Sequence, residues 1–257
     1  MPDQPVISGP IAALESDLPE LVVEAVTDYE YIRGSDDSET LRGTRADEII
    51  DGFGGDDRIY GGGGDDAVIY AGDGNDRVWG GNGDDGLTGD DGADRLWGGR
   101  GDDELMGDEA GTPDAGNDKL FGGAGHDSLF GNVGRDKLVG GGGRDVLFGA
   151  EGRDKLFGGG GHDTLLGMQG DDVLKGGGGR DHFYFHRNSG DDVIKDFKVG
   201  KDLILAPVKG FGQLKITDGA GGAEVGFKKA SVTLKGVEAD DLSKSDFHFG
   251  DDLWTWE

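Results

Sequence analysis

The residues of this sequence that are best suited to chemistry are aspartates that recur at every ninth position. Over residues 52–184 a nine-residue unit of the form G-G-x-G-x-D-x-U-x, in which U is apolar, occurs fourteen times with a few interruptions. The sixth position is always aspartate: Asp57, Asp66, Asp76, Asp85, Asp94, Asp103, Asp118, Asp127, Asp136, Asp145, Asp154, Asp163, Asp172 and Asp181. Because Ca²⁺ takes carboxylate and carbonyl oxygens as ligands, a regular series of carboxylates indicates a protein that collects hard cations.

The other fixed positions of the unit indicate the backbone that must hold these carboxylates. The fourth position is always glycine, and the eighth is always apolar, from Ile59 and Val68 through a run of leucines to Phe183. Glycines allow positive φ angles, so six residues can form a tight turn. The next three residues suit a short strand with one side chain pointing inward. Two units then close a coil of 18 residues, and stacked coils bring the aspartates of successive turns to about 4.8 Å, the strand spacing.

A column of carboxylates at that spacing repels itself unless cations lie between them. Carboxylates and turn carbonyls together form an all-oxygen cage that favours Ca²⁺ over Mg²⁺ or Zn²⁺. We therefore predict multiple Ca²⁺ ions, bound by the aspartates above, by Asp192 of a weaker last unit (residues 187–195), and by backbone carbonyls of Gly64, Gly83, Gly101, Gly125, Gly143, Gly161 and Gly179. The alternative, a disordered acidic tract, leaves the apolar residue at every ninth position unexplained, although it is what we expect without calcium.

Units such as GGGGDDAVI, GGNGDDGLT and GGRGDDELM resemble the RTX, or haemolysin-type, calcium-binding repeats. The resemblance implies a parallel β-roll with calcium in its turns and export by a type I secretion system of a Gram-negative bacterium. Residues 191–205 and the later string KASVTLKGVEADDLSKSDFHF resemble the segment that closes the roll of serralysin-type proteases. Members of that family carry an uncleaved export signal at this end, which residues 246–249 match loosely before eight further residues, GDDLWTWE.

The predicted fold is all-β: a parallel two-sheet β-roll with 18 residues per coil and a small C-terminal antiparallel cap. We assign residues 1–41 to an N-terminal cap or linker, 42–195 to the roll, and 196–257 to the C-terminal cap and export signal. Residues 33–51 look like decayed units; the one at residues 42–50 keeps Asp47 and Ile49 but has Arg45 in place of glycine, which predicts weak calcium binding or none. Tyr70 is a spare residue, and an insert around Thr112 is expected to bulge from a turn and leave its coil intact. In the cap, alternating residues predict short strands at 213–217, 224–227 and 231–234.

Alternate units differ at their second position. In even units it is always glycine: Gly62, Gly81, Gly99, Gly123, Gly141, Gly159 and Gly177. In odd units it is Phe53, Gly72, Asp90, Asp108, Asn132, Ala150 and Met168. This difference predicts that odd and even units occupy opposite edges and sheets. We expect more uniform calcium binding on the even edge, and strained or altered turns at Phe53, Ala150 and Met168.

The outward strand positions of the odd units combine a basic series with an aromatic one. The candidate residues are Arg58, Arg77, Trp79, Arg95, Trp97, Lys119, Phe121, Lys137, Lys155 and Phe157. Either the basic stems cover the rings, with cation–π contacts of about 0.5–1 kcal/mol each, or the face binds an acidic polysaccharide or lipopolysaccharide. The even strands are mostly neutral and apolar outside. We expect that face to meet the C-terminal segment, a second copy of the chain or a partner domain.

Composition limits the functions that this chain can have. A formal net charge of −28 opposes nucleic-acid binding. The 55 glycines argue against an ordinary globular core, and the absence of cysteine removes disulfides. The sequence shows neither a classical signal peptide nor an apolar stretch of 18 residues, so no transmembrane segment is predicted.

Because H-E-x-x-H, G-x-S-x-G and cysteine are all missing, we predict that the chain is not an enzyme. His126 and His162 are expected to be solvated turn residues, and His182, His186 and His248 lack metal-ligand spacing. The predicted function is a secreted calcium-binding module that folds outside the cell and acts at the cell surface or in the matrix. The alternative is the non-catalytic C-terminal module of a secreted protease, lipase or alginate epimerase. In either case protonation of the aspartates is expected to release calcium and unfold the roll.

Overall fold

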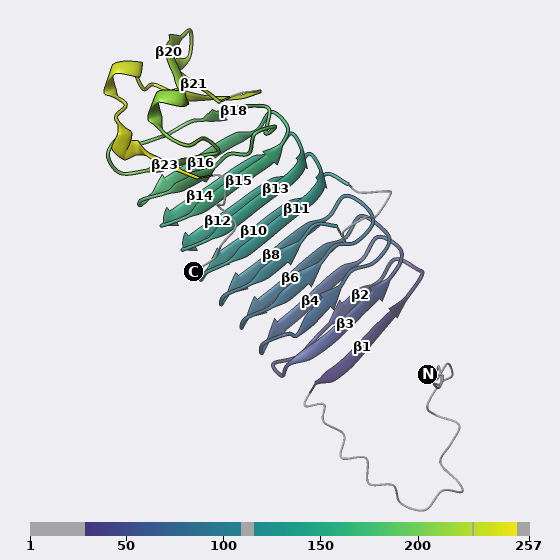
Figure 1. The fold of residues 1–257 in the computed structure, drawn as a ribbon. Coiled ribbons are helices and arrows are strands. Elements are labelled where there is room, and N and C mark those ends of the chain that lie inside the picture. Colours follow the sequence, from purple (N-terminus) through teal and green to yellow (C-terminus); the bar gives the residue numbers. More distant parts are fainter. Residues whose placement is uncertain (1–28, 109–115, 228, 251–257) are drawn as a thin grey trace, which may run out of the picture.

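The chain folds into a β-solenoid in which successive strands alternate between two facing sheets (Figure 1). The computed structural model describes residues 29–108, 116–227 and 229–250. One sheet has 11 strands: β1 Glu30–Ser35, β3 Glu48–Phe53, β5 Val68–Tyr70, β7 Gly86–Thr88, β9 Glu104–Met106, β11 Ser128–Gly134, β13 Val146–Gly152, β15 Thr164–Gln169, β17 His182–Tyr184, β19 Leu203–Ala206 and β23 Phe247–Phe249. All of its pairings are parallel.

The second sheet has 12 strands, in the order β2 Thr40–Arg42, β4 Arg58–Gly63, β6 Arg77–Asn82, β8 Arg95–Arg100, β10 Lys119–Ala124, β12 Lys137–Gly143, β14 Lys155–Gly161, β16 Val173–Gly178, β18 Asp191–Ile194, β22 Ala230–Lys235, β21 Gly222–Phe227 and β20 Lys215–Gly219. The pairs β20–β21 and β21–β22 are antiparallel, and the preceding pairs are parallel. Odd units supply this sheet and even units supply the other. The predicted two-sheet parallel roll with an antiparallel cap is therefore confirmed.

The core is a narrow file of side chains, one from each strand, between the two sheets. In the middle of the roll Leu120 pairs with Leu138 and Leu138 with Leu156. The inward residues of the roll are almost fully buried: Ile50, Ile59, Ile69, Val78, Leu87, Leu96, Leu105, Leu120, Leu129, Leu138, Leu147, Leu156, Leu165, Leu174, Phe183 and Ile194. Since each coil of about 18 residues buries only two such side chains, apolar burial stabilises a coil far less than it stabilises an ordinary domain of the same length.

Two predicted inward residues are wrong, both near the start of the array. Ile69, not Val68, is fully buried and pairs with Leu87. The spare residue of this unit is therefore absorbed between Asp66 and the strand, not after it at Tyr70. In the decayed unit the buried apolar residue is Ile50 instead of Ile49. In both units adjacent apolar residues fit the pattern equally well in sequence, and the pairing of the strands decides which one faces inward.

The ends of the roll differ from the middle. Stacking begins with β1, whose Glu30 pairs with Glu48, so parallel coils are present upstream of residue 42. Residues 1–28, which include most of the predicted N-terminal cap, lie outside the described residues. The stack continues across the predicted insert, because Lys119 pairs with both Arg95 and Lys137; the insert residues 109–115 themselves are not described.

The C-terminal cap adds strands to both sheets. β18 is followed by β22 in one sheet, and β19 by β23 in the other. The three predicted cap strands are present as β20, β21 and β22, although Gln213 lies in the short 3-10 helix η2, Phe211–Gln213, and not in a strand. Two further 3-10 helices, η3 Ala239–Asp241 and η4 Lys244–Asp246, precede β23. No helix within the described ranges is long and apolar enough to cross a membrane.

Candidate metal centre

The sixth-position aspartates form two columns of buried carboxylates, one along each edge of the roll. Each side chain is at most 2% exposed. Its Oδ1 accepts the backbone N–H of the sixth-position residue in the preceding coil, as in Asp136 to Asp154 at 2.9 Å and Asp145 to Asp163 at 3.0 Å. The odd column runs through Asp57, Asp76, Asp94, Asp118, Asp136, Asp154, Asp172 and Asp192, and the even column through Asp66, Asp85, Asp103, Asp127, Asp145, Asp163, Asp181 and Asp202.

The second carboxylate oxygen of these aspartates makes no hydrogen bond. In the described part of the chain, Oδ2 of all fourteen repeat aspartates and of Asp192 is buried and accepts no hydrogen bond. In units that begin with glycine, this oxygen lies against that glycine. A Cβ atom placed on Gly140, for example, would lie 2.3 Å from Asp145 Oδ2. A buried carboxylate oxygen without a partner is costly, so each turn presents a negative oxygen that calls for a cation.

Backbone carbonyls supply further oxygens in the same turns. Gly143 has a φ of 145°, and a Cβ atom there would lie 1.7 Å from the carbonyl oxygen of Gly125. At Gly161 the corresponding distance to the Gly143 oxygen is 1.4 Å. The fourth-position carbonyls therefore point along the stack into space that only glycine leaves open. No group of three or more His, Cys, Asp or Glu side chains within the described residues could hold a metal without such carbonyls.

The electrostatics of the columns also favour cations. Burial, reinforced by neighbouring carboxylates, raises the pKa of Asp94, Asp136 and Asp192 to about 8 against the opposing effect of the backbone N–H donors. The same causes raise the pKa of Asp76 and Asp85 to about 7. Unneutralised carboxylates are thus disfavoured in these turns near neutral pH. A divalent cation beside Oδ2 would reverse that preference, so the residues present fit calcium.

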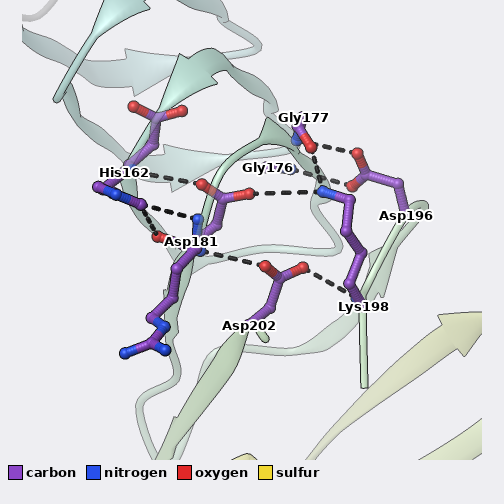
Figure 2. A network of polar contacts seen from close by, with 9 residues as sticks. His162, Gly176, Gly177, Asp181, Asp196, Lys198 and Asp202 are labelled. Carbon is purple, nitrogen blue, oxygen red and sulfur yellow. Dashed lines mark hydrogen bonds and ion pairs between the residues drawn. The ribbon is translucent and has the colours of Figure 1, made fainter. Parts of the chain in front are cut away.

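At the end of the even column, an ammonium group lies among the same types of oxygen. Figure 2 shows Lys198 reaching back into the last even turn, where its Nζ lies 4.0 Å from Asp181 Oδ2 and bonds the carbonyl oxygen of Gly177. Asp202 receives the backbone N–H groups of Asp181 at 3.1 Å and Lys198 at 2.9 Å. Asp196 caps the N–H groups of Gly176 and Gly177. A positive charge thus lies beside the sixth-position carboxylate and a second-position carbonyl, the arrangement expected of a bound cation.

Sequence reasoning missed four polar residues of these columns. Glu48, not Asp47, is the buried carboxylate of the decayed unit, and its N–H donates to Asp66 Oδ1 at 3.0 Å. Asp202 ends the even column, and Lys198 and Asp196 close its last turn. Asp202 carried a usable signal, because Gly200, Asp202 and Ile204 repeat the G-x-D-x-U spacing of the unit.

The predicted strain at the second position of odd turns is confirmed, whereas more uniform calcium binding on the even edge stays a prediction. Phe53, Asp90, Asn132, Ala150 and Met168 all have positive φ, between 69° and 76°. The turns keep their backbone geometry, so these non-glycine residues adopt a strained backbone conformation. Asp108 is the exception, since it does not share the positive φ; its buried carboxylate accepts the N–H of Gly116 at 3.2 Å.

The aromatic series on the outer face of the 12-stranded sheet forms a continuous stack. Ring centroids lie 4.6 Å apart for Tyr60 and Trp79, 4.8 Å for Trp79 and Trp97, and 5.6 Å for Trp97 and Phe121, with interplanar angles of 3–7°. The faces of the two inner rings are therefore occupied by other rings and are closed to sugars. Lys137 lies 5.3 Å from the Phe121 centroid, which supports the interpretation that basic stems cover the rings.

On the opposite sheet the outward apolar residues are less exposed than predicted. Leu166 is 5% and Thr88 is 3% exposed, and Ile69 belongs to the core. Phe130 and Phe148 are half-buried and pack with centroids 6.2 Å apart. Contact of this face with the C-terminal segment, a second copy or a partner domain stays a prediction.

A family model for the RTX calcium-binding nonapeptide repeat matches residues 33–68, 68–87, 87–109, 114–138, 130–165 and 157–194. The chain belongs to this family. Among solved structures, this RTX chain is similar to a repeat subunit of the Azotobacter vinelandii mannuronan C5-epimerase, at 22% identity and a TM-score of 0.32, over 65% of this chain and 82% of that one.

It is also similar to the extracellular lipase LipA of Serratia marcescens, at 19% identity and a TM-score of 0.30, over 87% of this chain. The chain spans about 40% of that lipase. A search of curated proteins found no significant match.

Proposed function

We propose that this chain is a secreted module whose folding is switched on by calcium, and that it acts outside the cell as a structural or binding element. The observation that carries the proposal is the pair of columns of buried, unpartnered Oδ2 atoms. A fold that buries this many uncompensated carboxylates has no stable form near neutral pH without cations. The same role applies if the module belongs to a larger secreted enzyme.

In this mechanism the chain's own residues do three things. Sixth-position carboxylates would hold the cation through Oδ2, while their Oδ1 accepts a backbone N–H of the preceding coil. Fourth-position glycines leave room for carbonyl oxygens to face the turn. The apolar file sets the spacing of the coils. Calcium bound in the turns supplies positive charge, and because it binds only the folded chain it stabilises that state by RT ln(1 + [Ca²⁺]/Kd) for each site. At the low calcium levels of a cytoplasm the chain would remain unfolded and ready for a type I exporter.

Far-UV circular dichroism with and without calcium, together with size-exclusion chromatography, tests this proposal. We expect a disordered spectrum and a large hydrodynamic radius in chelator, and a sheet spectrum with a compact radius in millimolar calcium, the range typical of extracellular modules. Retention of the sheet spectrum and of heat tolerance in a strong chelator would overturn it.

Binding of an acidic polysaccharide by the basic ladder is a separate part of the proposal. It rests on the aligned basic side chains of β4 to β14, for which Arg77 pairs with Arg95 and Arg95 with Lys119. A pull-down on an acidic polysaccharide in calcium should retain the native chain and lose a triple alanine variant of these three residues. A triple alanine variant of the exposed Lys195, Lys209 and Lys244 removes the same charge elsewhere and should be retained. Equal retention of both variants removes the ladder hypothesis.

A further inference from the structure

The even edge of the roll changes charge along its length. The fifth position of even units, which precedes the buried aspartate, is acidic at Asp65, Asp84 and Asp102. From the next unit onward it is basic or imidazole: His126, Arg144, His162 and Arg180. A cationic region is unexpected on a chain with a net charge of −28. Cationic side chains therefore gather at one end of this edge, which the overall composition hides.

The cationic end of this edge borders a half-open cavity of about 530 Å³. Its lining residues come from three successive coils and from the loop before β19: Arg144, His162, Thr164, Arg180, His182 and Lys201. No carboxylate is among them. Within the described residues, the guanidinium groups of Arg144 and Arg180 and the ammonium of Lys201 take part in no hydrogen bond or ion pair.

One of the two histidines that line the cavity is held so that it presents a donor. His162 Nδ1 accepts the backbone N–H of Arg180 at 2.8 Å. Nδ1 also lies 3.3 Å from the carbonyl oxygen of Arg180, but the shorter contact with the N–H group requires an acceptor, which assigns the hydrogen of the neutral ring to Nε2. The equivalent bond, from Arg144 N–H to His126 Nδ1, is also 2.8 Å. The backbone ladder thus fixes the imidazole orientation and leaves Nε2–H for a ligand.

The carboxylates next to the lining residues in sequence are not part of the cavity lining. Asp163 and Asp181 are buried in the even column and belong to the candidate calcium ligands. Both oxygens of Asp202 receive backbone N–H groups. On the opposite edge the contrast is clear, because Arg153, also a fifth-position arginine, pairs with Asp171 at 2.6 Å. The cationic groups of the cavity have no comparable partner in the described structure.

We propose that this cavity binds the tetrahedral oxyanion of a phosphate or sulfate monoester. Donors converge on it from several coils and from Lys201, which suits an anion with acceptor oxygens on every side, and guanidinium groups bind such anions through paired charge-assisted hydrogen bonds. The volume is within the range of small-molecule sites. The proposal rests on the proposed function, because the stacked coils that form the cavity require the calcium-folded roll.

Isothermal titration calorimetry in millimolar calcium, with the full chain and with glucose 6-phosphate or glucose 6-sulfate as the probe, tests this site. We expect saturable binding of at least one probe with one site per chain, and no binding of glucose. The double variant Arg144→Ala/Arg180→Ala should weaken binding at least tenfold. The matched double variant Arg135→Ala/Arg153→Ala, which removes two fifth-position arginines from the odd edge, should stay within about twofold, since charge lost far from the ligand is screened.

Two results would overturn the proposal: absence of saturable binding to the native chain, or equal weakening by both double variants. Circular dichroism of each sample in calcium separates this failure from failure of the proposed function. A chain that folds in calcium but binds neither probe contradicts only the oxyanion site, whereas a chain that does not respond to calcium contradicts the folding mechanism. Comparison of the two probes shows whether phosphate or sulfate is preferred.

Discussion

At the scale of single residues, two neighbouring glycines in one turn have very different roles. A Cβ atom on Gly161 would lie 1.4 Å from the Gly143 carbonyl oxygen, whereas a Cβ atom on Gly160 would meet nothing within 4 Å. We therefore expect Gly161→Ala to destabilise the calcium-loaded roll by about 2 kcal/mol or more, through overpacking and backbone strain. Gly160→Ala is the matched control and should change stability by less than about 0.5 kcal/mol.

Chemical denaturation of both variants in saturating calcium measures this difference. Equal stability of the two variants would mean that the turn relaxes around the added methyl group, and that the carbonyls are not held in place.

The residue types of the turns were predictable from the sequence because glycine and aspartate each have a single physical reason to recur. Only glycine tolerates the carbonyl of the next coil, and a buried aspartate both caps a backbone N–H and presents a free oxygen. The choice between Val68 and Ile69, or between Asp47 and Glu48, was not predictable. Adjacent residues of the same chemical type differ there only in strand pairing, which depends on contacts with neighbouring coils.

At the scale of elements, the loop between β18 and β19 closes the even column with a lysine. Lys198 Nζ lies beside Asp181 Oδ2 and the Gly177 carbonyl, so its ammonium neutralises the last turn without a metal. We expect Lys198→Met to free both oxygens, and the variant to bind one more calcium ion per chain or to require more calcium for folding. The exposed Lys195 offers a control in Lys195→Met, which should leave calcium binding unchanged.

Calcium stoichiometry by atomic absorption, together with calcium titrations followed by circular dichroism, measures both quantities. If the two variants behave alike, Lys198 has no role in ending the column.

The closing elements were only partly predictable. The alternating pattern of the cap strands indicated β20 to β22, but the lysine fills a turn with a group that the repeat pattern does not contain.

At the scale of the whole molecule, the raised carboxylate pKa values predict that pH acts in opposite directions with and without calcium. In the calcium-free roll the pKa values of Asp94, Asp136 and Asp192 are about 8, above their ordinary value of 3.8. A group whose pKa is raised on folding stabilises the folded state below its unfolded pKa, and this contribution is lost as pH rises through the folded pKa. The calcium-free chain should therefore gain sheet as pH falls from about 8 toward 5.

Circular dichroism of metal-depleted protein without added calcium, across this pH range, measures the effect. With calcium bound, the effect of acid is the opposite. Acidification should then reduce the sheet content, because protons compete with calcium for the same oxygens. Loss of sheet on acidification of the metal-depleted chain would contradict the assignment of buried, mutually repelling carboxylates. The expectation that acid unfolds the roll thus applies to the calcium-loaded form.

The alternation of units between two sheets was predictable from the second-position glycines, because the two edges need different backbone geometry. The start of the stack at β1 was only partly predictable: Gly34 and Gly43 continue the nine-residue spacing back from Gly52, but the turns after them lack the fourth-position glycine of the later coils. Strand pairing shows that β1 and β2 are part of the roll.

The hydrogen bonds between sixth-position aspartates join residues 18 apart through most of the array. Because every bond links equivalent atoms of successive coils, whole coils can be removed or added without changing these bonds, whereas extra residues within a coil must be taken up outside them, as in the 19- and 24-residue spacings. Deletion of residues 137–154 removes one complete coil and should yield a shorter roll that still folds in calcium. Deletion of residues 137–145 removes half a coil, so that every later unit moves to the opposite sheet and the cap strands meet the wrong partners; that chain should fail to fold. Shortening or lengthening of such a chain by evolution would therefore proceed in steps of 18 residues, with the cap carried along unchanged.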